Sequence, residues 1–82
     1  MASTPQRSVE ELAARLERRQ LLPPPAKRRL IRRRAGASQQ DIAAAVGVHR
    51  ETVSRWERGE RSPRGVHVDA YLAVLTRLEE FA

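Results

Sequence analysis

The sequence contains no cysteine, so neither disulfide bonds nor thiolate zinc sites can hold the chain together. Aromatic residues make up only 4% of the 82 residues, and no apolar run approaches the roughly 20 residues of a membrane-spanning helix. Segment 1–11, MASTPQRSVEE, also lacks the apolar stretch of a secretory signal. We therefore expect one small domain that is held together by side-chain packing and stays in the cytoplasm.

The sequence is equally poor in catalytic chemistry. It has no Gly-rich phosphate-binding loop, no cysteine nucleophile and no convincing Ser/His/Asp set. The two histidines, His49 and His67, are isolated from other residues that ligate metals. We therefore predict that the protein is not an enzyme and that it uses neither a metal nor another cofactor.

Positive charge is what the sequence has in excess. Sixteen Lys and Arg stand against ten Asp and Glu, and segment 23–65 alone contains eleven basic and four acidic residues. Such a concentration is typical of a protein that binds a polyanion such as nucleic acid. Solubility alone is the alternative explanation. Membrane-surface binding is disfavoured, because the basic stretches lack an adjoining face of Trp, Phe and Leu.

Two segments are expected before the domain. Residues 1–7 show no periodicity and are predicted to be a disordered leader. A leader helix follows over 8–20, since Ser8 and Glu11 form a capping-box pattern and apolar residues recur at helical spacing. We expect this segment, 8–22, to pack on the domain, with four leucines against the C-terminal helix: Leu12, Leu16, Leu21 and Leu22.

The remaining residues, 23–82, are predicted to form one all-α domain, with no strand-like alternation. Pro25 can open a helix over 25–34. Ser38 is a good N-cap for the next helix, which Gly47 ends.

The third helix of the domain, 50–58, follows after only two residues and ends at Gly59. Two short helices joined so tightly must cross steeply, which predicts a helix-turn-helix. A last helix is expected over about 66–80. Its Tyr71 is expected in the core. Its apolar stripe of Leu75, Leu78 and Phe81 is expected either in the core or at a dimer seam.

Helix 50–58 has two distinct faces. At about 100° per residue, its long polar side chains fall within an arc of about 140°: these are Arg50, Glu51, Ser54, Arg55 and Arg58. Val53 and Trp56 lie on the other side and are expected in the core. A DNA major groove accepts such a helix, because Arg can bind guanine in bidentate fashion. Glu51 can accept a hydrogen bond from cytosine or hold Arg55 in position.

Segment 36–63, GASQQDIAAAVGVHRETVSRWERGERSP, resembles the lambda-repressor-like (Cro and XRE type) helix-turn-helix domain. The resemblance rests on Ser38 and Gln39, on Ala43 and Gly47 at the crossing, on Val48 and Val53 as core anchors, and on the closing SRWERGERSP. It implies a domain of five short helices, to which the leader helix is an addition. It also implies sequence-specific binding of duplex DNA by a two-fold dimer on adjacent half-sites.

The resemblance also implies roles for single residues. Within the recognition helix, about 49–58, Arg50, Glu51 and Arg55 match positions that read base edges. Phosphate contacts are implied for Gln39, Thr52, Ser54 and Arg61, with Gln39 also able to support the first base reader. From the position of their side chains we add Arg58, on the recognition helix, and Arg32, on the basic arc of helix 25–34, as phosphate ligands.

The chain departs from the family pattern at two places. His49 stands where Ser or Thr usually caps the recognition helix, so we expect either a weaker start of that helix or an imidazole that caps it or donates to phosphate. Lys27 and Arg28 stand where an apolar residue is common, so helix 25–34 is expected to contribute little to the core. The leucines of the leader segment are expected to offset that deficit.

These observations predict a transcriptional regulator of the phage or mobile-element type. We expect a repressor that acts by occupancy, as a nucleoid-associated homodimer on a palindromic operator, since a single module buries too little surface for strong binding. One alternative is an architectural DNA-bending factor, such as an excision factor. The other is an antitoxin or adaptor that binds a protein partner through the leader or C-terminal helix, with DNA binding secondary.

Overall fold

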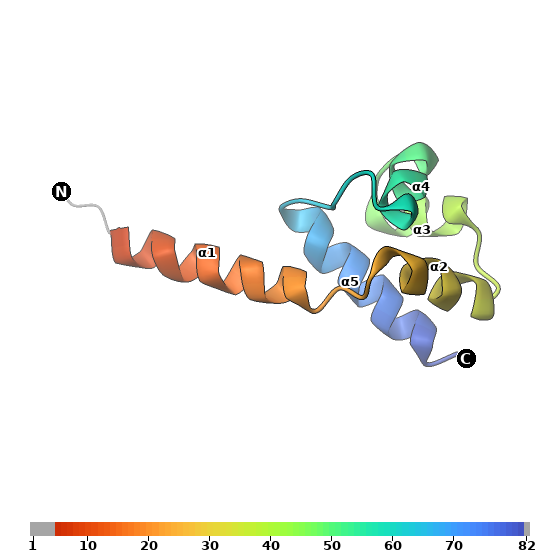
Figure 1. Ribbon diagram of the computed structural model, residues 1–82, viewed down its shortest axis with the longest axis horizontal. Helices are drawn as coiled ribbons and strands as arrows, with labels where there is room; N and C mark the ends of the chain where they lie inside the picture. The colour runs from red at the N-terminus through yellow and green to blue at the C-terminus, as the bar shows by residue number, and fades with distance from the viewer. Residues whose placement is uncertain (1–4, 82) are drawn as a thin grey trace.

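A computed structural model describes the backbone of residues 5–81 and the side chains of residues 8–81. In this range the chain forms no strand and five helices (Figure 1): α1 Pro5–Gln20, α2 Pro25–Arg34, α3 Gln39–Val46, α4 Arg50–Arg58 and α5 Val66–Glu79. The predicted all-α fold is confirmed. None of these described helices has the length and apolar character needed to cross a bilayer.

Proline, serine and glycine set the helix boundaries of the domain. α2 begins at Pro25, whose missing N–H is one that the first helical turn leaves unbonded in any case. The Ser38 hydroxyl accepts from the backbone N of Asp41 at 2.9 Å, and the Asp41 carboxylate accepts from the backbone N of Ser38 at 2.8 Å. Gly47 and Gly59 end α3 and α4 with φ of +88° and +75°, where a side chain would be strained. The predicted bounds of these three helices are therefore confirmed.

Helices α2 to α5 enclose a single core. α3 packs on α4 and α5, and α2 packs on the same two helices from another side. Val53 is fully buried and Trp56 is 3% exposed. The Trp56 ring lies 4.7 Å, centroid to centroid, from the ring of Tyr71 on α5, which confirms both aromatic residues as core. The other buried members are Ile31, Ile42, Ala43 and Leu75.

α1 stands apart from this packing. It extends away from the other helices (Figure 1), so that the molecule measures 51 × 24 × 20 Å. Its C-terminal end is tied to α5 by an ion pair, in which Arg18 Nε lies 2.5 Å from Asp69 Oδ1. α1 is therefore an arm that is attached to the domain near one end.

The start of α1 corrects the sequence interpretation. The helix begins at Pro5 rather than at Ser8, because proline is well suited to a first helical turn. Ser8 therefore lies inside the helix, and its predicted capping box is wrong. Residues 5–7 of the expected disordered leader are helical, and residues 1–4 lie outside the described residues.

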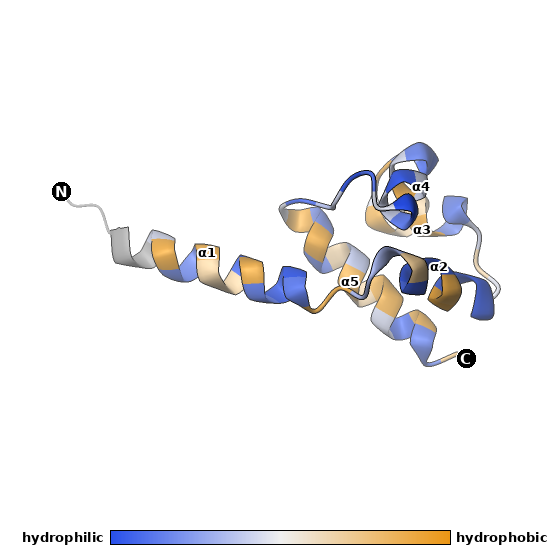
Figure 2. Ribbon diagram, viewed as in Figure 1, coloured by the Kyte–Doolittle hydropathy of each residue, from blue (hydrophilic) through white to orange (hydrophobic). Residues whose placement is uncertain are grey.

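The predicted packing of the leader leucines is wrong for three of the four. Leu12, Leu16 and Leu21 are 50%, 43% and 67% exposed, and only Leu22 packs against the core. The physical reason is the rotation of α1. Arg18 faces α5, and at about 100° per residue Leu12 and Leu16 lie about 120° and 160° around the helix from it. Figure 2 shows the resulting apolar segments along α1, outside the domain.

Two residues of the apolar stripe at the end of the chain, Leu75 and Leu78, pack in or against the core. Leu75 is 2% exposed, and Leu78 is partly buried against the same cluster, whereas Phe81 is 68% exposed. Of the two expectations for this stripe, the intramolecular one therefore holds for Leu75 and Leu78.

Candidate nucleic-acid interface

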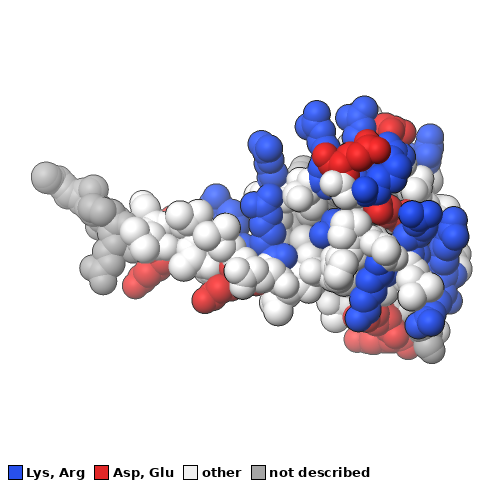
Figure 3. Space-filling model, viewed as in Figure 1, with Lys and Arg blue, Asp and Glu red and all other residues white. Residues whose placement is uncertain are grey.

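α4 turns its charged face to solvent. Arg50, Glu51 and Arg55 are exposed, while Val53 and Trp56 are buried on the opposite side. The predicted rotation of this helix is confirmed. Basic side chains gather around the same part of the molecule in Figure 3, along the edge that runs from the end of α1 past α4.

Acidic side chains hold the arginines of α4 in place. Glu51 Oε2 lies 3.7 Å from Arg55 Nε and 3.3 Å from Arg58 Nη2. Glu60 Oε2 lies 2.7 Å from Arg58 Nε, and the Ser54 hydroxyl also accepts from Arg58. The bonds to Glu60 and then Glu51 raise the pKa of Arg58, and the bond from Arg58 lowers the pKa of Glu60. In the free protein Glu51 therefore positions arginines, which is one of its two predicted roles.

Gln39 connects α3 to the first residue of α4. Its Oε1 accepts from Arg50 Nη1 at 3.3 Å, and its Nε2 donates to Glu57 Oε1 at 3.0 Å. Arg50 is therefore held at its exposed position by a side chain that is itself fixed to the interior. A contact between Gln39 and phosphate stays a prediction.

Arg32 and Glu57 form a buried ion pair beneath this surface. Arg32 Nε lies 2.5 Å and Nη2 3.0 Å from the two Glu57 oxygens, and Nη1 donates to the Ala37 carbonyl at 3.0 Å. The two residues are only 8% and 3% exposed. The prediction that Arg32 binds phosphate is therefore wrong, because all three of its nitrogens are bonded inside the protein.

The electrostatics of this pair follow from its hydrogen bonds. Burial by itself raises the pKa of Glu57, but the bonds from Arg32 and Gln39 outweigh burial and hold that pKa below its ordinary value. The hydrogen bond to Glu57 raises the pKa of Arg32. Both groups therefore stay charged inside the fold.

Arg28 takes the place of an apolar residue in the core wall. It is 8% exposed, and burial lowers its pKa. Its Nε donates to the Pro23 carbonyl at 2.7 Å, and its Nη1 donates to the Trp56 carbonyl at 3.1 Å, in the last turn of α4. Its guanidinium carbon lies 5.9 Å from the centroid of the Tyr71 ring. This arginine and Leu22, rather than Leu12, Leu16 or Leu21, therefore cover this side of the core.

The other predicted phosphate ligands differ in their accessibility. His49 is exposed at the N-cap of α4, but its side chain makes no capping hydrogen bond, so the predicted capping role is wrong. Thr52 is half-buried, and Ser54 is buried with its hydroxyl bound to Arg58. Arg61 is exposed in the loop after α4.

The sequence interpretation missed the interior network of Arg28, Arg32 and Glu57. One signal was present, because Glu57 follows Val53 by four residues and so lies on the buried side of α4. A carboxylate in that position requires a charged or hydrogen-bonding partner inside the protein.

The comparisons with known proteins agree with this architecture. The family model described as Helix-turn-helix matches residues 29–80, more than half of the chain. The matched segment begins within α2 and ends just after α5, and it contains α3 and α4 entirely. No curated protein and no solved structure gives a significant match.

Proposed function

The chain belongs to the lambda-repressor-like helix-turn-helix family of DNA-binding domains, and from this premise we propose that it regulates transcription by reading a specific duplex sequence with α4. The observation that carries the proposal is the exposure of Arg50, Glu51 and Arg55 on a helix whose other face is anchored by Val53 and Trp56. A major groove about 12 Å wide accepts one such helix.

Some side chains of α4 and its surroundings contact bases in this proposal, and others contact phosphates. Arg50 and Arg55 bind guanine edges, each with about 1 to 3 kcal/mol of discrimination, while Glu51 accepts from cytosine or keeps Arg55 in position. Ser54 orients Arg58. Phosphates on either side are bound by Gln39, His49, Thr52, Arg58 and Arg61. Repression follows from occupancy, since the bound protein excludes polymerase from the same stretch of DNA.

Selection of bound duplexes from a random pool tests the proposal, because it yields the preferred sequence directly. On that sequence, Arg50→Ala or Arg55→Ala should cost about 1 to 3 kcal/mol and relax the preference at one base pair. Arg77→Ala is the matched control, since Arg77 is a 72% exposed arginine near the end of α5. If Arg50→Ala and Arg55→Ala kept the same affinity and the same preference for the selected duplex as Arg77→Ala, α4 would not read sequence.

We further propose that two copies bind together, joined through α1. Val9, Leu12 and Leu16 lie within an arc of about 60° and are 63%, 50% and 43% exposed. This stripe lies on a different side of α1 from Arg18, which pairs with α5, and none of its three residues belongs to the hydrophobic core. A second copy of the same stripe is the occupant that we assign to it, since a two-fold pair buries both stripes at once.

Charge sets the orientation of the pair. Residues 5–12 of α1 include one basic and two acidic residues, Arg7, Glu10 and Glu11, for a net charge of −1. Residues 13–20 include three basic residues and one acidic residue, for a net charge of +2: Arg15, Glu17, Arg18 and Arg19. An antiparallel pair places the acidic half of one helix beside the basic half of the other, whereas a parallel pair places like charges together. The antiparallel arrangement is also two-fold symmetric, as a palindromic operator requires.

The size of the stripe indicates a weak pair. Six half-exposed apolar side chains contribute about 1 kcal/mol each on burial, against an association cost of about 4 to 15 kcal/mol. The two copies should therefore meet mainly on DNA, and cooperative binding is the property to measure. Leu12→Gln with Leu16→Gln should abolish cooperativity on a palindromic operator and leave half-site affinity unchanged.

The control variant is Leu21→Gln, because Leu21 is also an exposed leucine but lies outside α1. Unchanged cooperativity in the double variant would rule out pairing through α1. Copurification of a different chain at fixed stoichiometry would favour an adaptor or antitoxin instead. Strong bending in a circular-permutation gel would favour an architectural factor.

A further inference from the structure

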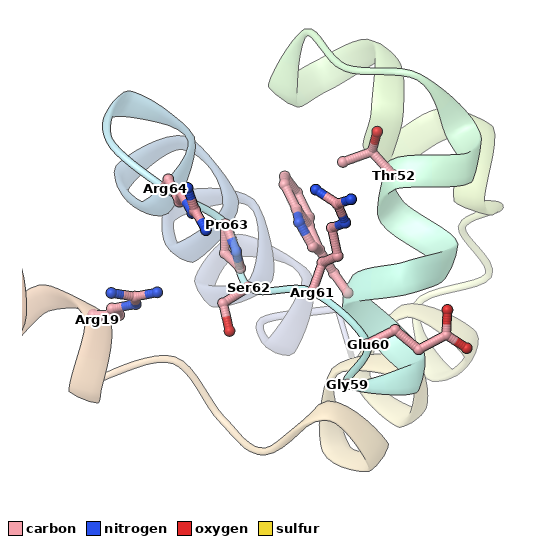
Figure 4. Close-up of a pocket in the computed structure, with 9 residues that line it drawn as sticks. Arg19, Thr52, Gly59, Glu60, Arg61, Ser62, Pro63 and Arg64 are labelled. Atoms are coloured by element: carbon pink, nitrogen blue, oxygen red, sulfur yellow. The ribbon is translucent and has the colours of Figure 1, made fainter.

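A second basic surface lies beside the recognition helix. A cleft of about 650 Å³ opens between the end of α1 and the loop that joins α4 to α5, and three arginines line it: Arg19, Arg61 and Arg64. In Figure 4, Arg19 reaches from α1 toward the loop, and Arg61 and Arg64 rise from the loop itself. Thr52 of α4 lines the same cleft, which therefore adjoins the proposed DNA-reading surface.

The basic surface continues along α1. A smaller hollow of about 310 Å³ is lined by Arg15 together with Arg19 and Arg64. The two hollows share Arg19 and Arg64, so that four arginines form one track from the middle of α1 to the foot of α4. Figure 3 shows basic side chains along this edge and acidic side chains along the lower edge of α1.

The four arginines of this track form no ion pair with the residues that the structure describes, and in this they resemble Arg29, Arg33 and Arg34 of α2. Arg18, Arg32, Arg58 and Arg77 each form an ion pair within the protein, and Arg28 donates to carbonyls. Glu60 is the one acid that lines the larger cleft, and its carboxylate binds Arg58. The track therefore presents four exposed guanidinium groups that no ion pair within the described chain neutralises, and an anion that lies along them gains favourable electrostatic contacts.

The ion pair that attaches α1 to α5 also positions Arg19 at the cleft. Arg18 pairs with Asp69 at 2.5 Å, and the next residue, Arg19, faces the cleft. The hydroxyls of Thr52 and Ser62 add hydrogen-bond donors to the same walls. Guanidinium groups and hydroxyls along an open track suit a series of phosphates rather than one small anion.

We propose that this track binds the phosphate backbone of duplex DNA that flanks the base pairs read by α4, so that α1 lengthens the footprint of the protein. The inference rests on the proposed function, because it requires α4 to lie in the groove beside the track. A small phosphorylated ligand has the same chemistry, and the experiment distinguishes that source from the DNA backbone.

The test uses the full-length chain and two duplexes that carry the selected sequence. One duplex is limited to that sequence, and the other adds about ten base pairs, one helical turn, on each side. Arg19→Ala and Arg64→Ala should each weaken binding to the long duplex about five- to tenfold near 0.1 M salt, and should lower the salt slope by about 0.9. Both should leave the short duplex almost unchanged. Arg77→Ala, the charge-matched control, should change neither.

Two outcomes would overturn the inference alone. One is that Arg19→Ala and Arg64→Ala behave like Arg77→Ala on the long duplex, while Arg50→Ala still loses sequence preference. The other uses Trp56, the single tryptophan of the chain, which lines the cleft and reports by fluorescence. If pyrophosphate binds saturably and Arg19→Ala abolishes that binding without weakening DNA binding, the cleft holds a small ligand. Loss of sequence preference in none of the variants would instead overturn the proposed function.

Discussion

Glu57→Gln should lower the free energy of unfolding by about 3 to 5 kcal/mol, the cost of removing one partner from a buried ion pair. The burial and the hydrogen bonds of Glu57 lead us to expect a larger loss of unfolding free energy than most single substitutions cause. Glu57 is 3% exposed and accepts three hydrogen bonds, two from Arg32 and one from Gln39. Glutamine has nearly the same shape but cannot balance the charge of Arg32, which is 8% exposed.

The loss is large relative to the whole fold. A chain of 82 residues has an expected unfolding free energy of about 4 to 12 kcal/mol. The variant should therefore be marginal, with Tm lower by roughly 15 °C or more. Urea and thermal unfolding at pH 7, followed by circular dichroism at the helix band, measure both quantities. A cost below about 1 kcal/mol, as for an exposed pair, would refute the burial argument.

A double variant separates the pair from its neighbours. Arg32→Met with Glu57→Leu replaces both charges by apolar side chains of similar volume, which is often neutral or stabilising for buried pairs. We expect its unfolding free energy to return to within about 1 kcal/mol of the unmodified chain. If the double variant lost as much unfolding free energy as the two single variants together, the cost would not come from leaving one charge of the pair unbalanced.

The pH dependence has a definite sign. Although burial opposes ionisation, the hydrogen bonds from Arg32 and Gln39 hold the pKa of Glu57 in the folded state below its unfolded value of 4.5. Its stabilising contribution is therefore complete above the unfolded pKa and is lost as the pH falls through the lower folded pKa. Urea unfolding between pH 7 and pH 3, at about one-unit steps, should show a steeper acid loss in the unmodified chain than in Glu57→Gln.

Two further predictions concern the backbone and the core. Gly47→Ala should cost about 1 to 2 kcal/mol from its φ alone, since a Cβ there meets nothing within 4 Å; Gly59→Ala should cost more, because its Cβ would lie 3.3 Å from Pro25 Cγ. Urea unfolding of the two variants should rank them in that order, and the reverse order would contradict the contact argument. Tyr71→Phe should be neutral within about 0.5 kcal/mol at pH 7, since the Tyr71 hydroxyl has no hydrogen-bond partner in the described structure. Burial raises the pKa of Tyr71 to about 12, so stability should fall as the pH rises from 10 toward 12 in the unmodified chain. An equal alkaline loss in Tyr71→Phe would assign it to another group.

Local signals made the domain predictable. The capping pair Ser38 and Asp41 and the terminating glycines Gly47 and Gly59 act within one helical turn, so their residue types alone define the bounds of α3 and α4. The rotation of α4 was predictable for the same reason, because Val53 and Trp56 are its only large apolar residues and must face the core.

The direction of the basic side chains of α2 was not predictable in this way. Periodicity placed Arg28 and Arg32 on one basic arc of the helix, from which we predicted that Arg32 binds phosphate, yet both side chains are buried. Their partners are Trp56 and Glu57, which lie 28 and 25 residues further along the chain. A pattern within one helix contains no information about which distant carbonyl or carboxylate will satisfy a guanidinium group.

The prediction of how α1 packs on the domain was wrong for a related reason. Spacing showed correctly that Leu12 and Leu16 share a face, but a shared face does not define what it contacts. The prolines after Leu22 end the helix, and the pair between Arg18 and Asp69 fixes which side of α1 meets α5. The exposed pair of Arg18 and Asp69 contributes little free energy. It nevertheless shows that the side of α1 with Arg18 faces α5, so the side with Leu12 and Leu16 does not.

Charge alone therefore overstated the number of basic side chains that are exposed for phosphate binding. Arg28 and Arg32 count among the eleven basic residues of segment 23–65, but their guanidinium groups donate hydrogen bonds to acceptors inside the protein. Arg32 nonetheless bears on recognition, since Glu57 holds Gln39 and Gln39 holds Arg50 at the surface. The same interior pair thus links the stability of the fold to the position of Arg50, the side chain that we propose reads a base. A substitution at Glu57 must therefore be judged on both unfolding and sequence preference, because loss of binding in an unfolded variant would say nothing about Arg50.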